Sequence, residues 1–181
     1  MNWENEFRHR IRRFEASASE KGEGLSFSIK IRVSSGCYHR EHSPRAYRII
    51  DDYLRAHPSN EFSFQEHESG PELLVYLSLG AAGISLTASV INLVTAIIKA
   101  RSEGIKRGDD RSTPLELIVR GFDRSGNLKE EKILKIDSND SVTKDLIGQA
   151  LNNSLNKMIS KDMKENKTRL IKKRKQLMPK P

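Results

Sequence analysis

The residues best suited to chemistry lie in the segment CYHREH, which follows the first expected strand. Cys37, His39 and His42 carry the thiolate and imidazole groups that zinc prefers. Structural zinc sites take four such ligands, and the sequence has no second pair at a familiar spacing. A polar loop between a strand and a helix would contain the same residues without a metal. The sequence therefore predicts no metal or cofactor, and Cys37, His39 and His42 are kept as the candidate metal ligands.

The other reactive groups form no recognisable catalytic arrangement. Cys37 beside a histidine could act as a nucleophile only with an orienting group and an oxyanion site. The acidic pairs Asp51–Asp52 and Asp109–Asp110 lie in no pattern typical of a magnesium or phosphate site. Charges on a solvated loop or helix face explain both pairs. We therefore expect a protein without catalytic activity.

The strongest concentration of charge lies at the end of the sequence. Residues 157–181 hold ten of the 32 lysines and arginines but only two of the 24 acidic residues, so the net charge of +8 belongs to them. Within this segment, Lys172, Lys173, Arg174 and Lys175 could bind nucleic acid through phosphates. They could also bind an anionic membrane surface, at about 1 kcal/mol per charge. A solvated tail that contacts nothing is the third interpretation.

The first part of the chain has three clear patterns. Apolar residues recur every three or four positions between Trp3 and Phe14, which predicts an amphipathic helix. Residues 25–33 alternate apolar and polar side chains, the period of a strand with one buried face. Ser43-Pro44 can cap and begin a helix, and a second strand is expected at 61–66. Strand, helix and strand in this order predict a βαβ unit.

The segment 73–98 is 26 residues long and carries no charge. As a helix it could cross the ~30 Å apolar core of a bilayer. Ser78, Ser85 and Asn92 recur every seven residues, and this small or polar stripe suits a helix packed closely against protein. We expect a long central helix covered by the sheet and by other helices or a second subunit. A single membrane span at 73–98 is the alternative.

The last third of the chain predicts a hairpin and a closing helix. Residues 115–122 and 128–136 are typical of strands, and the turn DRSGN joins them. An apolar stripe between Val142 and Ile159 predicts a helix, with Asp140 as its cap.

These patterns predict the α+β class, with a small mixed sheet around the central helix. The sheet would combine the βαβ unit with the hairpin. The predicted organisation is an N-terminal helix in residues 1–21, one domain over 22–160, and a basic, partly disordered helix or tail over 161–181.

The order of elements between residues 70 and 159 resembles a known family. The sequence PELL opens an expected small-residue helix, LGAAGISLTASVINLVTAIIKAR. A polar loop, the hairpin LELIVRGFDRSGNLKEEKILKI and a short closing helix follow. This order resembles the effector-associated constant component modules of bacterial conflict systems. Those modules are small α+β domains beside or fused to effectors such as proteases, nucleases and TIR domains. The resemblance covers about half of the chain. It implies an adaptor between an effector and a sensor, and it carries over no functional residue.

We therefore expect a non-enzymatic protein–protein interaction module. Its partner would be an effector, a sensor or a second copy of the chain. A single cysteine suits a reducing cytoplasm, and residues 1–14 contain no apolar run typical of a secretory signal. The alternatives are a single-pass inner-membrane protein anchored through 73–98, or a nucleic-acid-binding protein that acts through its basic tail.

Overall fold

Strand β1 (Leu25–Val33) lies at the centre of the sheet, and the alternation of its residues determines which of its side chains face the core. Phe27, Ile29, Ile31 and Val33 are buried on one face and belong to the hydrophobic core. The predicted strand over residues 25–33 is therefore confirmed. Its backbone pairs with one neighbour on each side, as a central strand must.

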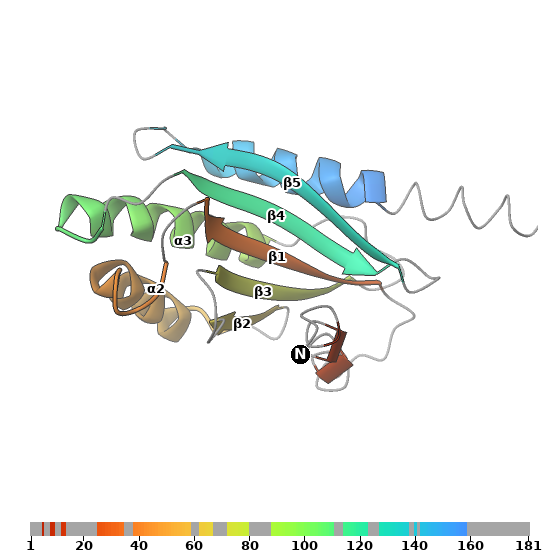
Figure 1. Cartoon of the computed structure of the whole chain (residues 1–181), viewed down its shortest axis with the longest axis horizontal. Helices are drawn as coiled ribbons and strands as arrows, with labels where there is room; N and C mark the ends of the chain where they lie inside the picture. Colours follow the sequence, from red (N-terminus) through yellow and green to blue (C-terminus); the bar gives the residue numbers. More distant parts are fainter. Residues whose placement is uncertain are drawn as a thin grey trace, which may run out of the picture.

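A computed structural model shows the sheet and the helices packed against it (Figure 1). The structure describes Asn5, Arg8, His9, Arg12, Arg13 and the ranges 25–34, 38–58, 62–66, 72–79, 88–110, 114–122, 127–137, 140 and 142–158. The other strands are β2 (Phe62–Glu66), β3 (Glu72–Leu79), β4 (Leu115–Phe122) and β5 (Leu128–Ile136). The helices are α2 (Pro44–Ala56), α3 (Ala88–Lys106) and a C-terminal helix over 144–158.

In the described part of the chain, five strands form one sheet in the order β2-β3-β1-β4-β5. Every neighbouring pair is antiparallel. Consequently β1 and β2 run parallel with β3 between them, and β3 and β4 run parallel with β1 between them. Helices α2 and α3 each connect one of these parallel pairs, so the fold contains two interleaved split β-α-β units. The hairpin β4–β5 and the C-terminal helix complete it.

The helices share one face of the sheet. Figure 1 shows α3 and the C-terminal helix behind the sheet, with α2 beside α3. Apolar residues from all three helices join the core residues of β1 and β4 in one cluster. The helical members of the cluster include Ala46, Tyr47, Ile50, Val90, Leu93, Val94, Ile97, Ile147, Leu151 and Leu155. The other face of the sheet is thus left without these helices.

The α+β class is confirmed, but the predicted mixed sheet is wrong. The expected βαβ unit exists as a crossover between parallel strands, and β3 inserts between them. Sequence order cannot reveal such an insertion, because β3 comes later in the chain and pairs non-locally with β1.

The single helix predicted over residues 73–98 is also wrong. Residues 73–79 belong to strand β3, and α3 begins only at Ala88. An uncharged apolar run fits a buried strand as well as a buried helix, and here it contains both. The described residues include no helix that is long and apolar enough to cross a membrane. The proposed span at 73–98 is therefore withdrawn.

Both predicted terminal segments lie largely or wholly outside the described residues. The described residues of the N-terminal segment are helical in the structure. The basic tail over 161–181, with Lys172, Lys173, Arg174 and Lys175, lies outside the described residues. Its binding roles stay predictions.

Candidate interaction surface

The segment with the predicted metal ligands lies beside the C-terminal end of α3. The imidazole rings of His39 and His42 have centroids 6.5 Å apart, and His42 Nδ1 lies 3.6 Å from Asp110 Oδ2. Cys37 lies outside the described residues. Among the residues that the structure describes, no group of three His, Cys, Asp or Glu side chains could hold a metal ion. The structure therefore does not test Cys37, His39 and His42 together as candidate metal ligands.

A buried carboxylate next to this segment has a structural role. Asp109 Oδ2 accepts a hydrogen bond from the backbone N–H of Ala46 at 2.9 Å, and Oδ1 accepts one from the backbone N–H of Arg45 at 3.3 Å. Both N–H groups belong to the first turn of α2, where a helix has no internal partner for them. Ser43, the expected cap, occupies the N-cap position without a side-chain hydrogen bond. Asp109 therefore caps α2 from the far end of α3.

The C-terminal end of α3 has a backbone conformation that places the Asp109 carboxylate next to α2. Gly108 has φ of 99°, and its N–H donates to Ile105 O at 3.1 Å, while Asp109 N–H donates to Gly104 O at 2.9 Å. This pair of bonds is the Schellman ending of a helix. A Cβ on Gly104 would overlap the Asp109 carboxylate and lie 2.9 Å from Ala46 N. The contact between α3 and α2 therefore requires glycine at 104.

The acidic pair Asp51–Asp52 also has ionic partners. Arg40 donates two hydrogen bonds to Asp51, at 2.6 and 2.8 Å, and a third to Glu66 at 2.8 Å. The hydrogen bonds from Arg40 lower the pKa of Asp51. Arg55 pairs with Asp52 one helical turn away. These contacts tie α2 to the preceding loop and to β2, so their role is structural.

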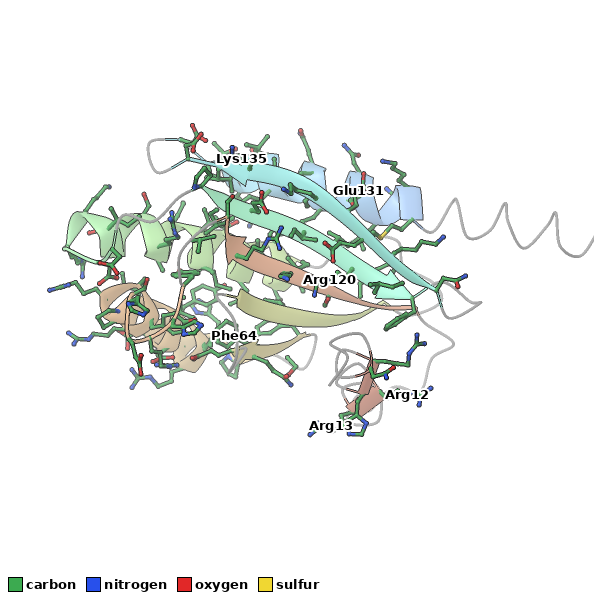
Figure 2. All side chains as sticks on the ribbon, in the orientation of Figure 1. Arg12, Arg13, Phe64, Arg120, Glu131 and Lys135 are labelled. Carbon is green, nitrogen blue, oxygen red and sulfur yellow. The ribbon has the colours of Figure 1, made fainter. Side chains whose placement is uncertain are left out.

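The sheet face opposite α2, α3 and the C-terminal helix brings together charged side chains from three strands. Because side chains alternate along a strand, the register determines which residues lie on this face. In these three strands they are Ser28, Lys30 and Arg32 of β1, Glu116, Ile118, Arg120 and Phe122 of β4, and Leu128, Glu130, Lys132 and Lys135 of β5. Ser28, Lys30, Glu116, Ile118 and Arg120 are buried, so the exposed cations of this face lie at its end. We call this surface the polar face. Figure 2 labels Arg120 and Lys135 on it.

Glu116 lies at one end of the polar face, between cations from two other strands. Arg32 Nε donates to Glu116 Oε2 at 3.0 Å, and Lys132 Nζ donates to Oε1. The Glu116 side chain is only 6% exposed, whereas those of Arg32 and Lys132 are 35% and 51% exposed. The hydrogen bond from Lys132 lowers the pKa of Glu116, and Arg32 adds to this effect against burial, which raises it. One buried carboxylate thus stays ionised between two solvent-accessible cations.

A shift in strand pairing gives Lys132 this position. The register of β4 with β5 changes by one residue between Leu117 and Ile118, which leaves Ile133 as an extra residue of β5. Lys132 then aligns with Ile118 on the polar face. Lys135 is exposed and lies opposite Glu116 in the register. We call Arg32, Glu116, Lys132 and Lys135 the cationic cluster.

The far end of the polar face is arranged differently. Arg120, which is buried, pairs with Glu130 across the hairpin. The guanidinium of Arg8 lies over the Phe122 ring, 4.3 Å from its centroid. This cation–π contact places a residue of the N-terminal helix against the sheet. At the Glu116 end, by contrast, the exposed cations outnumber the acidic side chains beside them.

The charges of the cationic cluster do not balance. Its basic residues are Arg32, Lys132 and Lys135, and its acidic residue is Glu116. This end of the polar face therefore carries a positive surplus, although residues 1–156 as a whole are neutral.

Comparison with known proteins identifies no relative: no family model, no curated protein and no solved structure matches the chain. Function is therefore inferred from the geometry of the chain itself.

Sequence reasoning missed the cationic cluster. The alternation in residues 25–33 predicts one buried apolar face, and by itself it assigns no role to the charged side. Lys and Glu at alternate positions of residues 128–136 were the available sign of a second charged strand face. The pairing of β1 with β4, which joins the two sets, is non-local and has no sequence pattern of its own.

Proposed function

We propose that the chain is a non-enzymatic interaction module that binds a partner protein through the polar face of its sheet. The observation that carries the proposal is the cationic cluster, in which two accessible cations share one buried carboxylate. Charges that are fixed in position by pairing select a partner by complementarity more than they add affinity. A surface of this kind suits recognition.

The exposed surface of the described residues also favours a polar contact. Leu146 is the single large apolar side chain that is exposed in this part of the chain. An interface that depends on a broad apolar patch therefore has no support there. An interface that reads a charge pattern does.

The finer proposal is an adaptor that connects an effector with a sensor in a bacterial conflict system. Its support is the part of the resemblance formed by the hairpin and the closing helix, which are present as elements. The first part departs from the family's order, because residues 72–79 form strand β3 and the helix begins only at Ala88. The absence of catalytic activity is part of the same proposal. Its support is that Asp109, Asp51 and Asp52 all have structural partners.

Affinity capture with matched variants tests the proposal. The full chain, a polar-face variant (K132Q/K135E) and a helix-layer variant (K99E/K106Q) would be immobilised and exposed to the same lysate. Lys99 and Lys106 are exposed on α3, so the second variant makes equal charge changes away from the polar face. We expect proteins that bind the unaltered chain and the α3 variant but not the polar-face variant. Equal capture by all three forms, or loss with the α3 variant alone, contradicts the proposal.

A further inference from the structure

We infer that the partner presents an acidic segment whose carboxylates bind at the cationic cluster. This inference depends on the proposed function and names the chemistry of the partner. It follows from the donors that the cluster offers, from its accessibility and from its charge.

The cluster has more hydrogen-bond donors than its own carboxylate uses. Arg32 directs Nε and Nη2 to Glu116, out of the five N–H donors of a guanidinium. Lys132 directs Nζ to the other oxygen, and an ammonium group has three donors. The donors that remain on both side chains can bind a second carboxylate from solvent.

The cations of the cluster are also accessible to solvent. Arg32 and Lys132 are 35% and 51% exposed, and Lys135 is exposed beside them. Strands β1 and β5 flank β4, so these cations span about 10 Å across the sheet. An extended acidic segment can place two or three carboxylates over that distance.

Nucleic acid is a poorer match for this surface. Phosphate backbones are bound by tracks of roughly 6–10 cations, and the cluster has three. Single-stranded nucleic acid also needs exposed aromatic rings for base stacking. On the described polar-face positions of β1, β4 and β5 the aromatic residue is Phe122, and Arg8 covers its ring. A second copy of the chain is disfavoured as well, because two cationic clusters carry the same positive surplus.

Glu116 makes the inference sharply testable. It competes with the partner's carboxylates for the same donors, so its neutralisation should release Arg32 and Lys132 for the partner. A residue whose role is only structural would give the opposite result when it is replaced. The replacement E116Q therefore separates recognition from folding.

Fluorescence anisotropy on the full chain provides the test, with a labelled oligoglutamate peptide as the probe. An oligoglutamine peptide and a single-stranded oligonucleotide of similar length are the comparison ligands. We expect oligoglutamate to bind the chain and E116Q to tighten this binding several-fold. K135Q should weaken it about three- to tenfold, and so should R32Q/E116Q/K132Q, in which three charged side chains are replaced by glutamine. Lys135 is exposed, so K135Q tests the cluster even where the triple variant unfolds.

Four outcomes overturn the inference. The first three are that oligoglutamate fails to bind the chain, that E116Q weakens its binding, and that the oligonucleotide binds more tightly than oligoglutamate. The fourth is that K172Q/K173Q/R174Q/K175Q abolishes oligoglutamate binding while K135Q does not. The proposed function fails separately, when partner capture is insensitive to K132Q/K135E. If K132Q/K135E loses a captured partner but the unaltered chain does not bind oligoglutamate, the proposed function holds. The inference that the partner presents an acidic segment is then wrong.

Discussion

At the scale of single residues, Asp109 holds two helices together through hydrogen bonds that no local pattern predicts. Its carboxylate is 1% exposed and accepts from the first turn of α2. The sequence suggested Ser43 as the cap, because serine before proline is a common helix start. In the structure Asp109 is the cap instead, because its carboxylate accepts a hydrogen bond from the N–H of Ala46, 63 residues earlier in the chain.

Asp109→Ala should therefore destabilise the fold. Loss of a helix cap costs about 1–2 kcal/mol of unfolding free energy. Urea denaturation followed by circular dichroism would measure the change. Asp110→Ala is the matched control, because the side chain of Asp110 is 72% exposed and it should leave the midpoint nearly unchanged. Equal effects of the two substitutions would show that Asp109 does not cap α2.

Gly104→Ala tests the contact on the other side of the same carboxylate. The added Cβ would lie 2.9 Å from Ala46 N and overlap Asp109, so α3 must move away from α2. We expect a loss of about 1–3 kcal/mol, as for overpacked cores. Gly148→Ala is the control, because its Cβ would meet only Ile91 Cδ1 at 3.3 Å, the end of a flexible side chain. A gain in stability from Gly104→Ala would contradict the described contact between the helices.

At the scale of elements, carboxylates of the hairpin β4–β5 bind to two neighbours, strand β1 on one face and the C-terminal helix on the other. Glu116 pairs with Arg32 of β1 on the polar face. Glu131 accepts hydrogen bonds from Ser154 at 3.0 Å and Lys157 at 2.5 Å, both on the C-terminal helix. The hydrogen bond from Lys157 lowers the pKa of Glu131. These two residues therefore fasten opposite faces of one hairpin.

The lowered pKa values of Glu116 and Glu131 predict a loss of stability in acid. A carboxyl group whose pKa is lower in the folded state binds its proton first in the unfolded state. Its contribution is complete above the unfolded value of about 4.3 and is lost as the pH falls through the folded value. Urea midpoints measured between neutral pH and about pH 3 should fall. E116Q should reduce this pH dependence, whereas E41Q, on an exposed loop residue, should keep it. A pH profile that E116Q leaves unchanged would contradict the assignment.

The same elements show how far the sequence determines the fold. Residues 25–33, 115–122 and 128–136 were predicted as strands because alternation and a turn motif are local properties. The segment 73–98 was misread because a run of uncharged residues gives no period that separates a buried strand from a buried helix. The antiparallel pairing of β1 with β3 then depends on contacts between distant segments. The candidate site has the same origin, because Arg32 meets Glu116 and Lys132 only through the equally non-local pairing of β1 with β4.

At the scale of the whole molecule, the division of charge separates a neutral body from a basic tail. The core already closes with Leu151 and Leu155 of the C-terminal helix. Deletion of residues 161–181 should therefore change the melting temperature of the domain by no more than about 2 °C, because their basic, mostly polar sequence predicts a solvated tail. Differential scanning calorimetry would measure the shift. A drop of ten degrees or so would show that the tail belongs to the folded domain.

The central claim is that the chain recognises a partner through the cationic end of its polar face. Backbone amide chemical shifts of the full chain, recorded by NMR during titration with an oligoglutamate peptide, test it most directly. We expect the largest shifts around residues 30–34, 115–118 and 132–136, where β1, β4 and β5 carry the cluster. Shifts confined to α2, to α3 or to residues 161–181 would contradict it.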